Sequence, residues 1–187
     1  MTSRRAFPPL YKSSGDTAFD RLAFFHILER LKTQKRTGWV DNNVLISDHM
    51  YRMAVLAMCV SDQSLDIAKC VMMALVHDLA EAQVGDIAPR EGIPKAEKSR
   101  LEAEAMQNFV REMLHDSPAA LRIMSLWKEY EDQSTAEARF VKASQALQPF
   151  FDSSIPHLRH TEVREWGADL LREREEMWER AGPRNGE

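Results

Sequence analysis

Apolar residues recur every three or four positions along most of this chain, and charged residues occupy the positions between them. This spacing predicts a series of amphipathic helices. The first should begin near Asp16 or Thr17 and end near Leu31, and a second should open at Ser47 as its N-cap. No window shows the alternation of apolar and polar residues that a half-buried strand requires.

The third predicted helix is the central one, because it is apolar on every side before it reaches a group of ionisable residues. It should be capped by Asp66, run unbroken to about Val84 and stop at Gly85. Residues 70–76 carry no charge, yet His77 and Asp78 follow them directly. A segment of this kind is buried in a core rather than laid on a surface.

Three more helices and a last long one follow. The expected ranges are Lys95 to about His115, a helix capped by Ser117 to about Tyr130, one capped by Ser134 with Glu137, and one capped by Thr161 to Trp178. We therefore expect an all-α bundle forming a single domain over residues 16–181, with a flexible N-terminal arm at 1–15 and a frayed tail at 182–187.

Composition agrees with this picture and narrows the function. Helix-forming residues are plentiful, glycine is scarce, and the 187 residues suit one domain. The net charge of −4, with both signs interleaved, gives no attraction to a nucleic acid polymer or an anionic membrane. No apolar run approaches the roughly 20 residues that cross a bilayer. Cys59 and Cys70 are expected to be reduced core thiols, so cytoplasmic localisation is the expectation, with a short mitochondrial leader as the alternative.

Burying His77 and Asp78 without partners would cost several kcal/mol. A metal ion removes that cost, since neutral imidazole and ionised carboxylate are ordinary ligands of divalent cations. On one continuous helix His77 and Glu81 would share a face, with Asp78 at its edge, and Asp86 lies just past the end. His49, alone, is typical of a hydrogen-bonded core residue; the second histidine on the next helix makes a ligand role arguable.

The sequence also resembles the HD-domain metal-dependent phosphohydrolases, and more narrowly their 5′-deoxynucleotidase branch. The motifs that carry the resemblance are KRTGW at 35–39, SDHMYRMA at 47–54, ALVHD at 74–78, VGDIAP at 84–89, IPK at 93–95, EYE at 129–131 and AEARFVK at 136–142. It covers about residues 17–142.

The resemblance implies an all-α HD-domain bundle, usually a homodimer, that removes phosphate from deoxyribonucleoside 5′-monophosphates with a divalent cation such as Co²⁺, Mn²⁺ or Mg²⁺. It implies His49, His77 and Asp78 as metal ligands, and Glu81 and Asp86 as the residues that orient or deprotonate the attacking water and handle the leaving oxygen. It further implies that Arg36 and Trp39 contact substrate. From chemistry alone, Trp39 is more typical of a lid over the core.

One departure stands out. The family's fourth metal ligand is an aspartate a few residues after the Phe-Val-Lys element, whereas here the next carboxylate after Lys142 is Asp152. The chain therefore resembles a family member that lacks an internal segment after about residue 142. Asp152 could substitute only if its segment folded back over the site.

Three functions remain open on the sequence. The first is a nucleotide phosphohydrolase, the second a catalytically impaired metal-binding or dimerising relative, and the third a helical interaction module in which His77 and Asp78 form a satisfied buried pair.

Overall fold

The structure is a computed structural model, and it describes residues 5–36, 44–145, 147 and 155–181. Its elements in chain order are α1 (Thr17–Leu28), η1 (Glu29–Lys32), α2 (Ile46–Met58), α3 (Ile67–Ala74), α4 (Glu81–Val84), η2 (Pro89–Glu91), α5 (Lys95–Asn108), η3 (Phe109–Met113), α6 (Pro118–Asp132), α7 (Ala136–Gln145), η4 (Ile155–His157) and α8 (Thr161–Ala181). The expected all-α architecture is confirmed, and the described residues contain a single isolated β-bridge, between Lys35 and Leu45.

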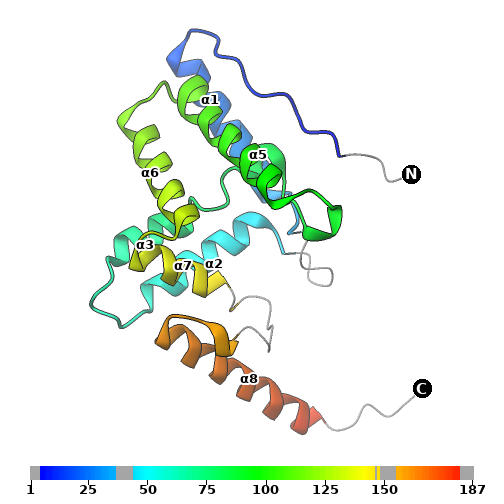
Figure 1. Cartoon of the computed structure of the whole chain (residues 1–187), viewed down its shortest axis with the longest axis vertical. Helices are drawn as coiled ribbons and strands as arrows, with labels where there is room; N and C mark the ends of the chain where they lie inside the picture. Colours follow the sequence, from blue (N-terminus) through cyan, green and yellow to red (C-terminus); the bar gives the residue numbers. More distant parts are fainter. Residues whose placement is uncertain (1–4, 37–43, 146, 148–154, 182–187) are drawn as a thin grey trace, which may run out of the picture.

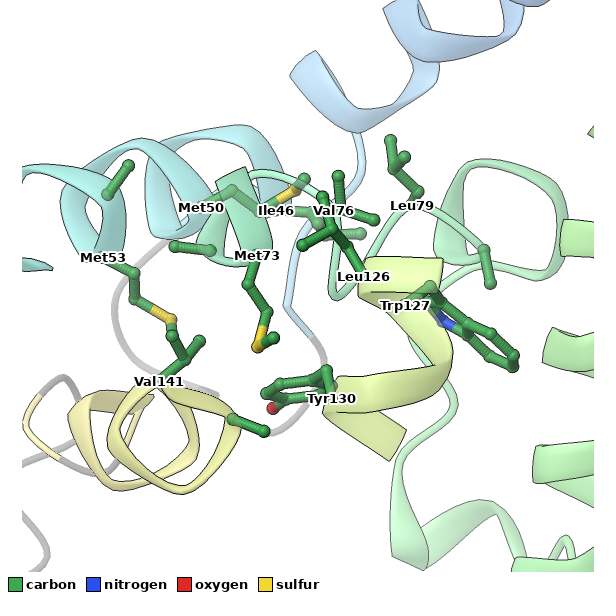
Figure 2. Close-up of a cluster of buried hydrophobic side chains, with 14 of the residues drawn as sticks. Ile46, Met50, Met53, Met73, Val76, Leu79, Leu126, Trp127, Tyr130 and Val141 are labelled. Carbon is green, nitrogen blue, oxygen red and sulfur yellow. The ribbon is translucent and has the colours of Figure 1, made fainter. Parts of the chain in front are cut away.

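The centre of the molecule is formed by α2, α3, α6 and α7, in which α3 and α7 contact each other and each contacts both α2 and α6. Beside them, α1, α4, α5 and η3 pack together. Figure 1 shows α8 at the opposite end of the long axis from α1. Within the central group Met53 of α2 meets Val141 of α7, and Met73 of α3 points toward Tyr130 of α6 (Figure 2). This apolar layer supports the segment that carries His77 and Asp78.

Local sequence sets several helix starts as expected. Asp16 accepts hydrogen bonds from the amides of Ala18 and Phe19, Asp66 caps α3 and Ser117 caps α6. These side chains satisfy amides that a helix start leaves without an intrahelical acceptor.

Two expected caps are wrong. The helix that was to open at Ser47 begins at Ile46, with no side-chain cap, because the amide of Ile46 donates to the carbonyl of Gln34 instead. The cap of α7 is Thr135 rather than Ser134, since the Thr135 hydroxyl accepts from the amide of Ala138.

The unbroken third helix is also wrong. Helix α3 ends at Ala74, residues 75–80 form tight turns, and α4 restarts at Glu81. The Nδ1 atom of His77 lies 2.9 Å from the carbonyl oxygen of Ala74, the acceptor that a continuing helix would give to the amide of Asp78. The sequence predicted that His77 and Glu81 share one face of a continuous helix. Because the helix is interrupted between them, they do not.

Residues 5–15 differ from the expectation of a loose arm. They run extended along the helices and are attached by hydrogen bonds, among them that of the Tyr11 amide to Asn108 and that of the Tyr11 hydroxyl to Asp20. The frayed tail expected at 182–187 lies outside the described residues. Among the helices that are described, none combines the length and the apolar character needed to cross a membrane.

Candidate metal centre

His49, His77 and Asp78 converge at one place in the core. His49 comes from the first turns of α2, while His77 and Asp78 come from the turns between α3 and α4. One ligand atom from each residue can be chosen so that all three lie within 4.8 Å of one another. Both histidines are buried, His49 completely, and the Asp78 side chain is 12% exposed. The dipeptide and the more distant histidine thus form a cluster whose donor set fits a metal site.

The orientation of His77 favours such a site. Because the carbonyl oxygen of Ala74 can only accept, its contact with Nδ1 places the ring proton there and directs the Nε2 lone pair inward. Nε2 is buried, makes no hydrogen bond within the described part of the chain, and lies 3.1 Å from Oδ2 of Asp78. Two lone pairs at that distance require a cation between them, either a proton or a metal ion.

His49 and Tyr130 both lie beside the pair formed by His77 and Asp78. Nε2 of His49 lies 3.7 Å from the same Asp78 oxygen, and the two imidazole rings are 5.4 Å apart, edge to face. The ring of Tyr130 lies 4.9 Å from that of His77. The Tyr130 ring therefore packs directly against one of the two imidazoles of the cluster.

Arg36 joins the cluster from a distant segment. Its amide donates to the carbonyl of Val44, next to the Lys35–Leu45 bridge, so it is held just ahead of α2. Its Nη1 atom donates to Oδ2 of Asp78 at 2.6 Å. The structure thus places this predicted substrate residue against the central carboxylate, while Trp39 lies outside the described residues.

The charges around Asp78 set its protonation. Burial alone would raise the pKa of Asp78, but the facing His77, Arg36 and His49 hold it well below its usual range. The carboxylate is therefore ionised, as a metal ligand must be.

Glu81 and Asp86 form an acidic pair beside the cluster. Glu81 is 3% exposed, and burial, followed by the negative charges of Asp78 and Asp86, raises its pKa well above the ordinary value. Asp86 follows Gly85, whose φ of 70° is unfavourable for residues with a Cβ. The charges of Asp78, Glu81 and Asp86 all act on Arg36, which agrees with one shared site.

Three charged side chains around the site, Lys98, Glu102 and Lys142, were not predicted from the sequence as part of it. Burial would lower the pKa of Lys98 of α5, but nearby carboxylates raise it above its ordinary value. The largest of these effects comes from Glu102, which lies 3.5 Å from the ammonium, and smaller ones come from Glu81, Asp86 and Asp78. Burial raises the pKa of Glu102 to about 7. Because Lys142 belongs to the Phe-Val-Lys motif that carries the family resemblance, the motif could have indicated that this lysine lies near the site.

Lys142 and Gln145 extend the site toward α7. The Lys142 ammonium lies 3.3 Å from the Tyr130 hydroxyl, which donates to Oε1 of Gln145 at 3.1 Å. Within the described residues the cluster contains three His, Cys, Asp or Glu side chains and no fourth. Asp152, the suggested substitute, lies outside the described residues.

The chain belongs to the HD-domain family, because the model of that family matches residues 28–177. It is 43% identical to human 5′-deoxynucleotidase HDDC2, across 86% of this chain and 89% of the human protein. It is 37% identical to 5′-deoxynucleotidase hdd1 of Schizosaccharomyces pombe, across 83% of this chain and 90% of the yeast protein.

Solved structures agree on the fold. The HD domain-containing protein YGK1 superposes with a TM-score of 0.71 at 31% identity, covering 88% of this chain and 90% of its own. A protein from Magnetospirillum magnetotacticum superposes with a TM-score of 0.67 at 22% identity, covering 84% and 92%.

The human match also bears on the shortened region. It extends over 184 residues yet covers only 86% of this 187-residue chain, so part of the human protein inside the match has no counterpart here. This agrees with the resemblance to a family member that lacks an internal segment.

Proposed function

We propose that this chain is a metal-dependent 5′-deoxynucleotidase that hydrolyses deoxyribonucleoside 5′-monophosphates to deoxynucleoside and phosphate. The observation that carries the proposal is the convergence of His49, His77 and Asp78 within 4.8 Å. The relatives named 5′-deoxynucleotidase supply the substrate class, with 43% and 37% identity over most of the chain.

His49, His77 and Asp78 would hold a divalent cation, with Co²⁺, Mn²⁺ and Mg²⁺ as candidates. When bound, such a cation lowers the pKa of a coordinated water and neutralises charge on the phosphoryl group. The ionised Asp78 and the inward Nε2 of His77 support this assignment.

Glu81 and Asp86 would manage protons. Burial, followed by the charges of Asp78 and Asp86, raises the pKa of the Glu81 carboxylate, which favours its accepting a proton from water and returning one to the leaving 5′ oxygen. We assign these two residues to orienting and deprotonating the attacking water and to handling the leaving group.

Arg36 and Trp39 would contact substrate. A guanidinium offers two parallel donors to phosphate oxygens, and Arg36 already lies at Asp78 with its side chain only 10% exposed. The assignment of Trp39 rests on the family motif alone.

The experiment is phosphate release from dAMP, dGMP, dCMP and dTMP, each with Co²⁺, Mn²⁺ or Mg²⁺, with AMP as the ribose comparison and EDTA as the metal-free control. We expect metal-dependent release from the deoxynucleotides and little from AMP. Absence of release from every deoxynucleotide, with metal bound, would instead favour the catalytically impaired relative. The lack of a fourth carboxylate among the described residues of the cluster points to that relative.

We also propose a homodimer located in the cytoplasm. Phe19, Leu22 and Phe25 lie three residues apart on α1 and are at least half exposed, which would supply an apolar surface for a second copy. Both cysteines are free, as a reducing compartment would leave them. Sedimentation at several concentrations tests the dimer.

A further inference from the structure

The N-terminal segment reaches the acidic pair from behind. Nη1 of Arg5 donates to the carbonyl oxygen of Asp86 at 2.9 Å, and Nη2 donates to that of Val84 at 2.8 Å. These two carbonyls flank Gly85, so one guanidinium holds both sides of the turn that presents Asp86.

Gly85 and Glu91 complete this attachment. A Cβ at Gly85 would lie 2.1 Å from Nη2 of Arg5, so the guanidinium occupies the space that glycine leaves open. Arg5 also pairs with Glu91 at 2.9 Å, and Glu91 accepts from the amide of Ala88. The ion pair thus links the start of the chain to the residues that follow Asp86.

A second attachment holds α4 itself. Gln83 is buried, and its Nε2 donates to the carbonyl oxygens of Pro8 and Pro9 at 2.8 and 3.1 Å. Because α4 begins with Glu81, the same segment, residues 5–9, is tied to both members of the acidic pair.

We propose that Arg5 is a positioning residue for the hydrolytic reaction: it fixes the Val84–Asp86 turn and so sets the placement of the Asp86 carboxylate relative to Glu81. This inference rests on the proposed function. A glycine turn with positive φ has much conformational freedom, so outside contacts must select one geometry. A displacement of about 1 Å in a reacting group can cost roughly 100-fold in rate.

The test compares Arg5→Ala and Arg5→Lys with the control Tyr11→Phe. The control removes the hydrogen bond between Tyr11 and Asp20, which anchors the same segment away from the turn. We expect Arg5→Ala to lower kcat about 10- to 100-fold, with KM for the deoxynucleotide and metal content kept. Arg5→Lys, which retains the charge but not the two-pronged contact, should fall between Arg5→Ala and wild type.

Amide hydrogen exchange over residues 84–88 gives a readout independent of activity. We expect faster exchange there in Arg5→Ala and wild-type exchange in Tyr11→Phe, even if that control melts at a lower temperature. If Arg5→Ala does not fold, Arg5→Lys must show a smaller change in the same direction.

Wild-type kcat and exchange in the Arg5 variants would overturn the inference, and so would an equal loss of kcat in Tyr11→Phe, which would indicate a general stabilising role. An inactive wild-type enzyme would count against the proposed function instead. Exchange over residues 84–88 would then still decide whether Arg5 fixes the turn.

Discussion

Two aspartates in this molecule, the buried Asp20 and the largely buried Asp78, both face histidine, yet their surroundings differ. The oxygens of Asp20 accept five hydrogen bonds, from the Tyr11, Ser13 and Ser14 hydroxyls, the Ser14 amide and His115. At Asp78 one oxygen, Oδ2, accepts from Arg36 at 2.6 Å and also faces the Nε2 atoms of His49 and His77.

The two sites differ in whether every buried polar atom has a hydrogen-bond partner, and not in the direction in which the aspartate pKa is shifted. Burial would raise the pKa of Asp20, but the hydrogen bonds from Ser13, Ser14 and Tyr11 lower it well below the usual range, much as the facing charges do for Asp78. At Asp20 the hydrogen bonds complete a structural joint between the N-terminal segment and α1. At Asp78 the buried Nε2 atom of His77 makes no hydrogen bond within the described residues and lies 3.1 Å from the carboxylate, an arrangement that either a metal ion or a proton can complete.

The largest difference between the two sites is expected when a proposed metal ligand beside Asp78 is removed. His77→Ala should abolish metal uptake and lower kcat/KM by more than about 100-fold, because even residues that only support a ligand cost 10–100-fold. Metal analysis of the purified protein measures the first effect. His26→Ala, at an exposed histidine of α1, is the matched control. Full metal occupancy in His77→Ala would show that the ligands are misassigned.

A smaller effect is expected from adding a carboxylate at the edge of the same site. Gln145 is linked through the Tyr130 hydroxyl to the ring that contacts His77. Gln145→Asp should tighten metal binding by about tenfold, because an anionic oxygen binds a divalent cation better than an amide. Titration calorimetry measures the affinity, and Gln107→Asp on the exposed face of α5 controls for added charge. Equal affinities in the two variants would mean that position 145 does not reach the cation.

Substitution of the other aspartate, Asp20, is expected to have no effect on metal binding. Asp20→Asn should leave metal affinity unchanged and lower the melting temperature at pH 7 by several degrees, since an amide cannot accept all the hydrogen bonds that Asp20 accepts. Because the folded-state pKa of Asp20 is depressed, its contribution to stability is present above the unfolded pKa of about 3.9 and is lost as pH falls toward the folded value.

Thermal melts of wild type and Asp20→Asn between pH 7 and pH 3 measure this. The difference in melting temperature should stay the same from pH 7 down to about pH 4 and shrink as the pH falls below the unfolded pKa. A constant difference across that range would mean that the charge of Asp20 contributes nothing, and the contrast between the two aspartates would then lose its electrostatic basis.

The sequence by itself determined the helical architecture and the types of side chain in the candidate metal site. Helix starts at Asp16, Asp66 and Ser117 follow from contacts within three residues, which periodicity and capping residues encode locally. The His-Asp dipeptide at the end of an apolar run likewise indicated a buried polar site, because such groups need a partner wherever the fold puts them.

Only the tertiary structure decided how that site is assembled. The break after Ala74 depends on a side-chain contact of His77, and the pairing of Arg36 with Asp78 joins residues 42 apart in the chain. The contacts of Arg5 with Val84 and Asp86 span about twice that separation. Contacts of this kind depend on how helices pack, and no local pattern records them. The sequence therefore predicted the residues of the His-His-Asp cluster but not the contacts that orient them.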